Sequence, residues 1–126
     1  MTMRTPLATV KGLGAAKEGV GHWWHQRLTA LALIPLSVWF CVAIARLPEA
    51  DYTTLVAWIS APFNAVLLIA LVMASLYHGY LGVQVVVEDY VHPHWVRTLL
   101  IVSSGFAALL LSIGAIFVIL KLAVEN

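Results

Sequence analysis

Residues 53–87, TTLVAWISAPFNAVLLIALVMASLYHGYLGVQVVV, contain no aspartate, glutamate, lysine or arginine. As one straight helix these roughly 35 residues would extend for about 50 Å, whereas the hydrocarbon core of a bilayer is about 30 Å thick. Pro62 resolves this mismatch, because proline is favoured in the first turn of a helix and interrupts a helix elsewhere. The stretch therefore predicts a short interfacial helix over 53–61, followed by a transmembrane helix over 62–89.

The composition of the whole chain indicates a lipid environment. The chain has 126 residues, of which 62% are hydrophobic and 10% are charged, and its mean hydropathy is +0.94. A soluble domain carries roughly a quarter charged residues, so this chain has too little polar surface to cover a globule in water. The net charge of +1 excludes nucleic-acid binding driven by a basic surface. The one cysteine, Cys41, lies in an apolar run and is interpreted as a small buried hydrophobic residue.

Two further apolar segments complete a three-helix pattern. Segments 28–46 and 97–120 are each close to the roughly 20 residues that a transmembrane helix needs. Pro35 lies inside the first segment, where neighbouring helices can accommodate a kink. Strands are excluded, because an open sheet leaves unpaired backbone groups in lipid. The sequence therefore predicts an all-α integral membrane protein with three transmembrane helices, forming a single membrane domain over 1–126.

Lysine and arginine are distributed unequally between the two sides that three spans define. The N-terminal segment 1–27 and the loop after the second span share one side, which holds Arg4, Lys11, Lys17, Arg27 and Arg97. The other side holds Arg46 and Lys121. Because positive charges are enriched on the cytoplasmic side of membrane proteins, the N-terminus is predicted to be cytoplasmic. Tryptophans would then mark both interfaces, with Trp23, Trp24 and Trp95 on the cytoplasmic side and Trp58 on the other.

His78 lies deep within the second span. About 24 Å of helix separates it from Pro62 and about 18 Å separates it from Tyr90, so its imidazole is well inside the bilayer. An ionisable group at that depth is costly and indicates a function by default. A neutral imidazole has one donor and one acceptor nitrogen, which suit either an interhelical hydrogen bond or an axial bond to haem iron. Gly79 and Gly82 would let a helix or a flat macrocycle approach closely, so both interpretations stay open.

The remaining histidines lie at the predicted cytoplasmic ends of the spans, and they are His22, His25, His92 and His94. The chain therefore does not supply two histidines that face each other across a haem at mid-depth. If His78 binds haem, the second axial ligand comes from another polypeptide or is absent. This predicts an obligate partner, and three short helices on their own also form a poor membrane core.

The second span ends in Glu88-Asp89-Tyr90, and Pro93 prevents the helix from continuing. One interpretation is an interfacial cap, with the tyrosine in the aromatic belt and the carboxylates in water. The other is a ligand site in which the phenol donates a hydrogen bond to a carbonyl and a carboxylate tunes it. Arg27, at the start of the first span, is likewise either a cytoplasmic anchor or a group that binds an anion such as a haem propionate.

Two stretches carry a resemblance to a known family, GHWWHQRLTALALIPL at residues 21–36 and YHGYLGVQVVVEDYVH at residues 77–92. The chain resembles the small hydrophobic membrane-anchor subunits of succinate dehydrogenase, respiratory complex II, in the form found in alphaproteobacteria and mitochondria. The most specific shared feature is a histidine followed eleven and twelve residues later by Asp-Tyr, which is met here by His78, Asp89 and Tyr90.

The resemblance implies a role for each of these residues. His78 would be an axial ligand of haem b, with the other ligand supplied by the cytochrome b subunit. Tyr90 would donate a hydrogen bond to a ubiquinone carbonyl, and Asp89 would lie in the same pocket. Arg27 would approach a haem propionate and the quinone region. Some bacterial relatives have a histidine six residues before that arginine, where this sequence has Gly21, so the neighbouring histidines are not assigned.

The resemblance also implies partners and a location. In this family the flavoprotein and iron-sulfur subunits hold FAD and the iron-sulfur clusters and oxidise succinate, while the anchor holds them at the membrane. The chain would then be a subunit of a redox enzyme in the bacterial inner membrane, with no catalytic residue of its own. The alternative is a scaffold or transporter component in which His78 forms only a packing hydrogen bond. The paired half-sequences typical of many transporters are not evident.

Overall fold

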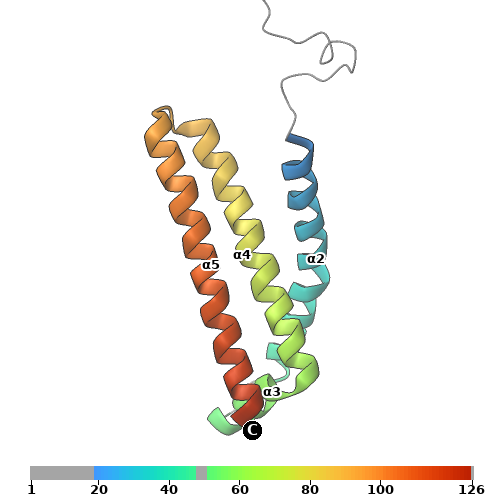
Figure 1. Ribbon diagram of the computed structural model, residues 1–126. Helices are drawn as coiled ribbons and strands as arrows, with labels where there is room; N and C mark the ends of the chain where they lie inside the picture. The colour runs from blue at the N-terminus through green and yellow to red at the C-terminus, as the bar shows by residue number, and fades with distance from the viewer. Residues whose placement is uncertain (1–18, 48–50, 126) are drawn as a thin grey trace, which may run out of the picture.

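The computed structural model describes residues 19–47 and 51–125, and this part of the chain is helical (Figure 1). The helices are α2 (Gly19–Ala45), α3 (Tyr52–Ser60), α4 (Pro62–Tyr90) and α5 (His94–Glu125). Three of them, α2, α4 and α5, are long and apolar enough to cross a membrane. The predicted fold class, three transmembrane helices with a short helix before the second one, is confirmed.

The helices extend beyond the apolar segments read from the sequence. α2 begins at Gly19, well before the predicted span over 28–46, and it continues through Pro35 without ending. α5 begins at His94, directly after the proline that ends the preceding loop, and continues to Glu125. Hydropathy detects only the residues that suit the hydrocarbon core of a bilayer. The helices are longer because their backbone hydrogen bonds continue into the interfacial region. α4 begins at the predicted proline.

Side-chain hydrogen bonds hold the short helix α3 at both ends. The Asp51 carboxylate accepts hydrogen bonds from the Thr54 amide at 2.9 Å and the Thr53 hydroxyl at 2.7 Å. The hydrogen bonds from Thr54, followed by the one from Thr53, lower the pKa of Asp51 to about 2, so this cap stays charged near neutral pH. At the other end, Asn64 Nδ2 donates to the carbonyl of Trp58 at 2.8 Å, which satisfies a carbonyl that the helix end leaves free.

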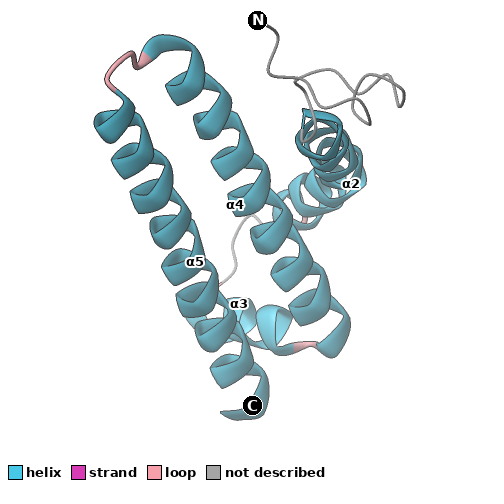
Figure 2. Ribbon diagram, turned by 45° about the horizontal axis from the view of Figure 1, so that its top comes forward, coloured by secondary structure: helices cyan, strands magenta, loops and turns pink. Residues whose placement is uncertain are grey.

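Helix α4 lies between α2 and α5 (Figures 1 and 2). It contacts both of them, whereas α2 and α5 do not contact each other over the described ranges. The Tyr80 ring of α4 packs against Gly105 of α5, where an added Cβ would come within 3.3 Å of Tyr80 Cε2. A glycine here therefore permits the close approach of the two helices.

The buried core is small, and its hydrophobic side chains are Val56, Ala65, Leu81, Val87 and Ile119. Cys41, predicted to be buried, is instead exposed on α2. That prediction was wrong because a helix that packs against one neighbour buries only one face. Large apolar side chains remain exposed along all three long helices, so lipid or other helices must cover them.

The helix ends lie at the two ends of the molecule in the arrangement expected for three successive membrane crossings. α2 begins at the end where α4 stops and α5 starts, and α3 and the C-terminus lie at the opposite end (Figure 1). The cytoplasmic orientation of the first end stays a prediction. Part of the charge asymmetry on which it rests, Arg4, Lys11 and Lys17, belongs to segment 1–18, which lies outside the described residues.

A fusion experiment is expected to place the end of α2 outside the cytoplasm, because more lysine and arginine residues lie on the other side. Alkaline phosphatase fused after Leu47 should be active, and the same enzyme fused after His92 should be inactive. Fluorescent-protein fusions at the two positions serve as the reciprocal control and should give the opposite pattern. An inactive phosphatase after Leu47 would reverse the orientation and move the predicted quinone site to the other face.

Candidate functional site

His78 lies on the face of α4 that packs against α2. Its imidazole is half-buried, and Nδ1 lies 2.9 Å from the hydroxyl oxygen of Thr29. The same hydroxyl donates toward the carbonyl oxygens of His25 at 2.8 Å and Gln26 at 3.1 Å. The second ring nitrogen, Nε2, makes no hydrogen bond within the described part of the chain. An interhelical hydrogen bond therefore uses one nitrogen of His78 and leaves the other available.

A cavity of about 850 Å³ opens between α2 and α4, next to this hydrogen bond. On α4 it extends from Tyr77, the neighbour of His78, to Glu88, and on α2 it extends from Gly21 to Arg27. Its lining residues are Gly21, His22, Trp23, His25, Gln26 and Arg27 of α2 and Tyr77, Tyr80, Leu81, Gln84, Val85 and Glu88 of α4.

The cavity contains polar atoms with unused hydrogen-bonding capacity. His22 Nε2 and Gln26 Oε1 are buried and have no hydrogen-bond partner in the described ranges. These residues are four apart on α2, so their side chains share one helical face. Across the cavity, Gln84 Nε2 donates to Glu88 Oε1 at 3.0 Å. Buried polar atoms are normally paired, so the unpaired ones indicate that a ligand, a partner side chain or water completes the cavity.

Arg27 adds a positive charge to the cavity. Its guanidinium carbon lies 5.5 Å from the centre of the Trp23 ring, at cation–π distance. Among the described residues, the acidic side chains form no ion pair with it. Arg27 lines this cavity, whereas His78 does not. The two predicted residues are linked only through Thr29, which contacts His78 and follows Arg27 by two residues on α2.

Asp89 and Tyr90 lie at the end of α4, outside this cavity. The Tyr90 side chain is 77% exposed, Asp89 is exposed as well, and neither side chain forms a hydrogen bond within residues 19–47 and 51–125. About 18 Å of helix separates Tyr90 from His78. The structure therefore does not assemble Asp89 and Tyr90 with His78 or Arg27, and their shared pocket stays a prediction.

The donor set fits a haem better than a metal ion held by several side chains. Over the described residues, histidine, cysteine, aspartate and glutamate do not gather into a group of three or more that could hold a metal ion. A haem needs only one axial side chain from each side of its plane. His78, with Nε2 available and Nδ1 held by Thr29, meets that requirement.

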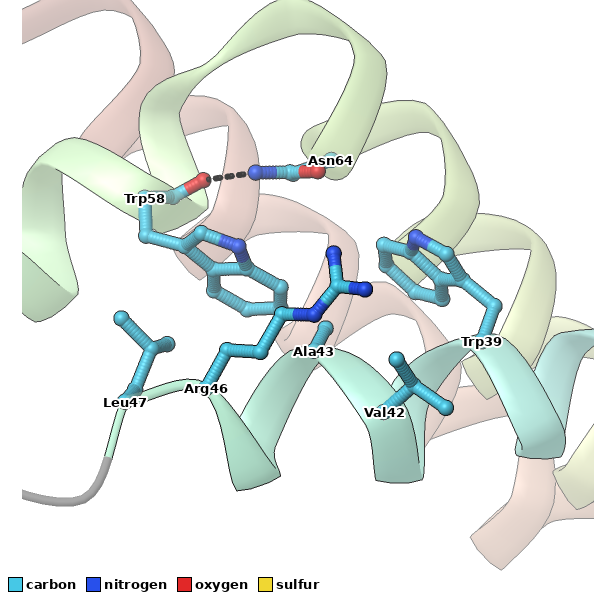
Figure 3. Close-up of a pocket in the computed structure, with 7 residues that line it drawn as sticks. All are labelled: Trp39, Val42, Ala43, Arg46, Leu47, Trp58 and Asn64. Carbon is cyan, nitrogen blue, oxygen red and sulfur yellow. Dashed lines mark hydrogen bonds between the residues drawn. The ribbon is translucent and has the colours of Figure 1, made fainter.

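A second cavity of about 470 Å³ lies at the other end of the molecule, where α2 ends. Trp39 of α2 and Trp58 of α3 stack there with ring centres 5.9 Å apart and an interplanar angle of 19°. Figure 3 shows the Arg46 side chain extending toward the space beside these two indoles and Asn64 above them. The predicted site residues do not line this cavity. It lies between the end of α2 and the junction of α3 and α4.

The sequence did not single out Thr29, which contacts His78, or four residues that line the cavity, namely Gln26, Gln84, Tyr77 and Tyr80. The available signal was a polar side chain inside an apolar span, as at Thr29 and Gln84. The sequence does not specify which faces of α2 and α4 meet, so it could not pair Thr29 with His78.

The helices and the cleft define an integral membrane protein with a polar site between its first and second long helices. The model of the family described as succinate dehydrogenase/fumarate reductase transmembrane subunit matches residues 1–119, and the chain belongs to this family. The succinate dehydrogenase hydrophobic membrane anchor subunit of Rickettsia bellii is 34% identical over 85% of this chain and 86% of its own length. The corresponding subunit of Rickettsia conorii is 37% identical over 79% of each chain, and that of Paracoccus denitrificans is 31% identical over 68% of this chain and 67% of its own. The resemblance drawn from the sequence motifs is confirmed.

Proposed function

We propose that this chain works as the membrane anchor of a bacterial succinate:ubiquinone oxidoreductase in the inner membrane. In that complex it helps to bind haem b, forms part of the ubiquinone-reduction site and docks the flavoprotein and iron-sulfur subunits. The observation that carries the proposal is the His78 imidazole, which Thr29 holds through Nδ1 at 2.9 Å in the middle of a membrane-spanning helix. An ionisable group at that depth is functional by default.

The haem-binding part of the proposal assigns roles to His78 and to residues that line the cavity between α2 and α4. His78 Nε2 would be one axial ligand, and the other would come from the cytochrome b anchor subunit. Arg27 would meet a haem propionate, because its charge has no acidic partner among the described residues. The unpaired His22 Nε2 and Gln26 Oε1 would add polar contacts along the same cleft. When bound, the haem supplies a one-electron carrier within the membrane.

The ubiquinone-binding part of the proposal concerns the end of α4. The exposed Tyr90 phenol would donate a hydrogen bond to a quinone carbonyl oxygen, and this bond would strengthen as the oxygen gains negative charge during reduction. The neighbouring Asp89 carboxylate would tune that phenol from within the same pocket. Because neither residue lines the cavity between α2 and α4, partner subunits would supply the remaining walls.

The packing of α2 supports an obligate partner. α2 packs mainly against α4 and leaves large apolar side chains such as Leu31, Ile34 and Val38 on the surface. A second anchor subunit packed along α2 and α4 would cover part of this surface and bring its axial ligand to the cleft. The iron-sulfur subunit would dock on the predicted cytoplasmic face, because its cluster must reach a quinone head near Tyr90.

Purification of the affinity-tagged chain in mild detergent tests this function. We expect flavoprotein, iron-sulfur and cytochrome b subunits to copurify, and the dithionite-reduced complex to give the sharp bands of a low-spin b haem. The complex should reduce a short-chain ubiquinone with succinate. A scaffold or transporter component would instead purify without haem and without succinate-dependent quinone reduction, and that result would contradict the proposal.

A further inference from the structure

We infer that the hydroxyl of Thr29 fixes which ring nitrogen of His78 carries the proton, and thereby leaves Nε2 free to bind iron. The inference rests on the function proposed above, because it concerns the nitrogen through which His78 would hold haem. Thr29 on α2 would then position His78, the proposed haem ligand on α4.

The Thr29 hydroxyl has fewer protons than polar neighbours. The hydroxyl has one proton and three polar neighbours, namely the carbonyl oxygens of His25 at 2.8 Å and Gln26 at 3.1 Å, and His78 Nδ1 at 2.9 Å. Carbonyl oxygens only accept, and a threonine inside a helix commonly donates to the carbonyl four residues earlier. With its proton directed at His25, the Thr29 oxygen presents a lone pair to Nδ1, so Nδ1 is the donor.

This assignment fixes the tautomer of the imidazole. A neutral histidine with its proton on Nδ1 has an unprotonated Nε2, whose lone pair can bind a metal. The opposite assignment would turn the hydroxyl proton away from both carbonyl oxygens and put the imidazole proton on Nε2, where it would block iron. The two carbonyl contacts of Thr29 therefore favour the ligating form of His78.

The hydrogen bond also affects the strength of the ligand. A partner for the second N–H of a metal-binding histidine orients the ring and raises the basicity of the ligating nitrogen. Here the partner is itself a donor to the His25 carbonyl, and hydrogen bonds in such a chain strengthen one another. A more basic Nε2 stabilises ferric over ferrous haem, so loss of the Thr29 hydroxyl shifts the haem toward the ferrous form.

The test replaces Thr29 in the complete complex. Thr29→Val keeps the branched shape but removes the acceptor, and we expect the ferrous-to-ferric ratio at a fixed potential to rise by up to about tenfold, which is about 59 mV for a one-electron couple. The electron paramagnetic resonance signal of the low-spin ferric haem should also change, because the ring is no longer held. Thr29→Ser restores a hydroxyl and should keep both the potential and the signal close to those of the parent.

The chain offers a matched control in Thr98, whose hydroxyl donates to the His94 carbonyl at 3.0 Å on α5. Thr98→Val loses the same local hydrogen bond and should leave the haem unchanged. If Thr29→Val does not assemble, Thr29→Ala is measured instead, with the same expectation. An unchanged potential and signal in the apolar variant overturns the inference, as does a serine variant altered to the same extent as the apolar one.

These outcomes are distinguishable from a failure of the proposed function. If His78→Ala leaves the low-spin haem intact, the axial ligand itself is wrongly assigned. If His78→Ala removes the low-spin haem and Thr29→Val leaves its potential and signal unchanged, only the role of Thr29 fails.

Discussion

Replacing His78 by alanine is expected to remove the low-spin, bis-histidine spectrum of the purified complex. The imidazole is the one group of this chain that we place on the iron, and its Nε2 is unused by the rest of the described structure. Because the second ligand is proposed to lie on the cytochrome b subunit, a five-coordinate haem with an altered potential could be retained. The decisive readout is therefore the ligation state, measured by optical and electron paramagnetic resonance spectra, and not the presence of colour.

The matched control for this variant is His92→Ala. His92 lies beyond the end of α4, is exposed and makes no side-chain hydrogen bond in the described part of the chain. Its replacement should leave the haem spectrum unchanged. A His78→Ala complex that contains all four subunits and still shows the parental low-spin spectrum and potential would disprove the ligand assignment.

Replacing Tyr90 by phenylalanine is expected to slow electron transfer from succinate to ubiquinone by about one to two orders of magnitude. The aromatic ring is retained, so packing and interfacial anchoring should change little. The loss is one hydrogen bond to an oxygen that becomes negatively charged, and such a bond contributes roughly 1.5–3 kcal/mol, which corresponds to the stated range of rates. Succinate oxidation with a water-soluble dye that accepts electrons before the quinone should remain near normal.

Tyr52 provides the matched control, because it is exposed to the same extent as Tyr90, 77%, but begins α3 at the opposite end of the molecule. Tyr52→Phe should leave ubiquinone reduction unchanged. Haem content should be parental in both variants, since His78 is untouched. Quinone reduction by Tyr90→Phe within about twofold of the parent, a difference of roughly 0.4 kcal/mol, would make Tyr90 an interfacial anchor only.

Most of the helical architecture could be predicted because it depends on properties of single segments. A bilayer imposes a minimum apolar length, and Pro62 begins α4 because proline is favoured in the first turn of a helix. Helix ends were less predictable, as the start of α2 at Gly19 illustrates, because interfacial residues with little hydropathy signal still form backbone hydrogen bonds. The burial of Cys41 was mispredicted because hydropathy does not distinguish lipid from protein as the apolar surroundings.

The site was predictable only in part, for a related reason. His78 could be selected because a polar group in hydrocarbon is costly wherever the neighbouring helices lie. Its contact with Thr29 depends on how far α2 is shifted and rotated against α4, which is determined by packing between segments distant in the sequence. The same limit applies to Arg27, which could be placed near the start of a span but not assigned to a cleft beside His22 and Gln26.

The exposed outward face of α2 has a consequence for how this sequence can vary. Along the outward face of that helix, side chains such as Leu31 and Ile34 are mostly exposed, so the fold of this chain sets little cost for replacing them by other apolar residues. That cost is set by whatever molecule lies against the face. Where lipid lies there, any apolar residue serves equally well. Where another polypeptide lies there, a change of side-chain volume on α2 requires a compensating change in the partner chain. Residues of the two proteins would then have to change together, although different genes encode them.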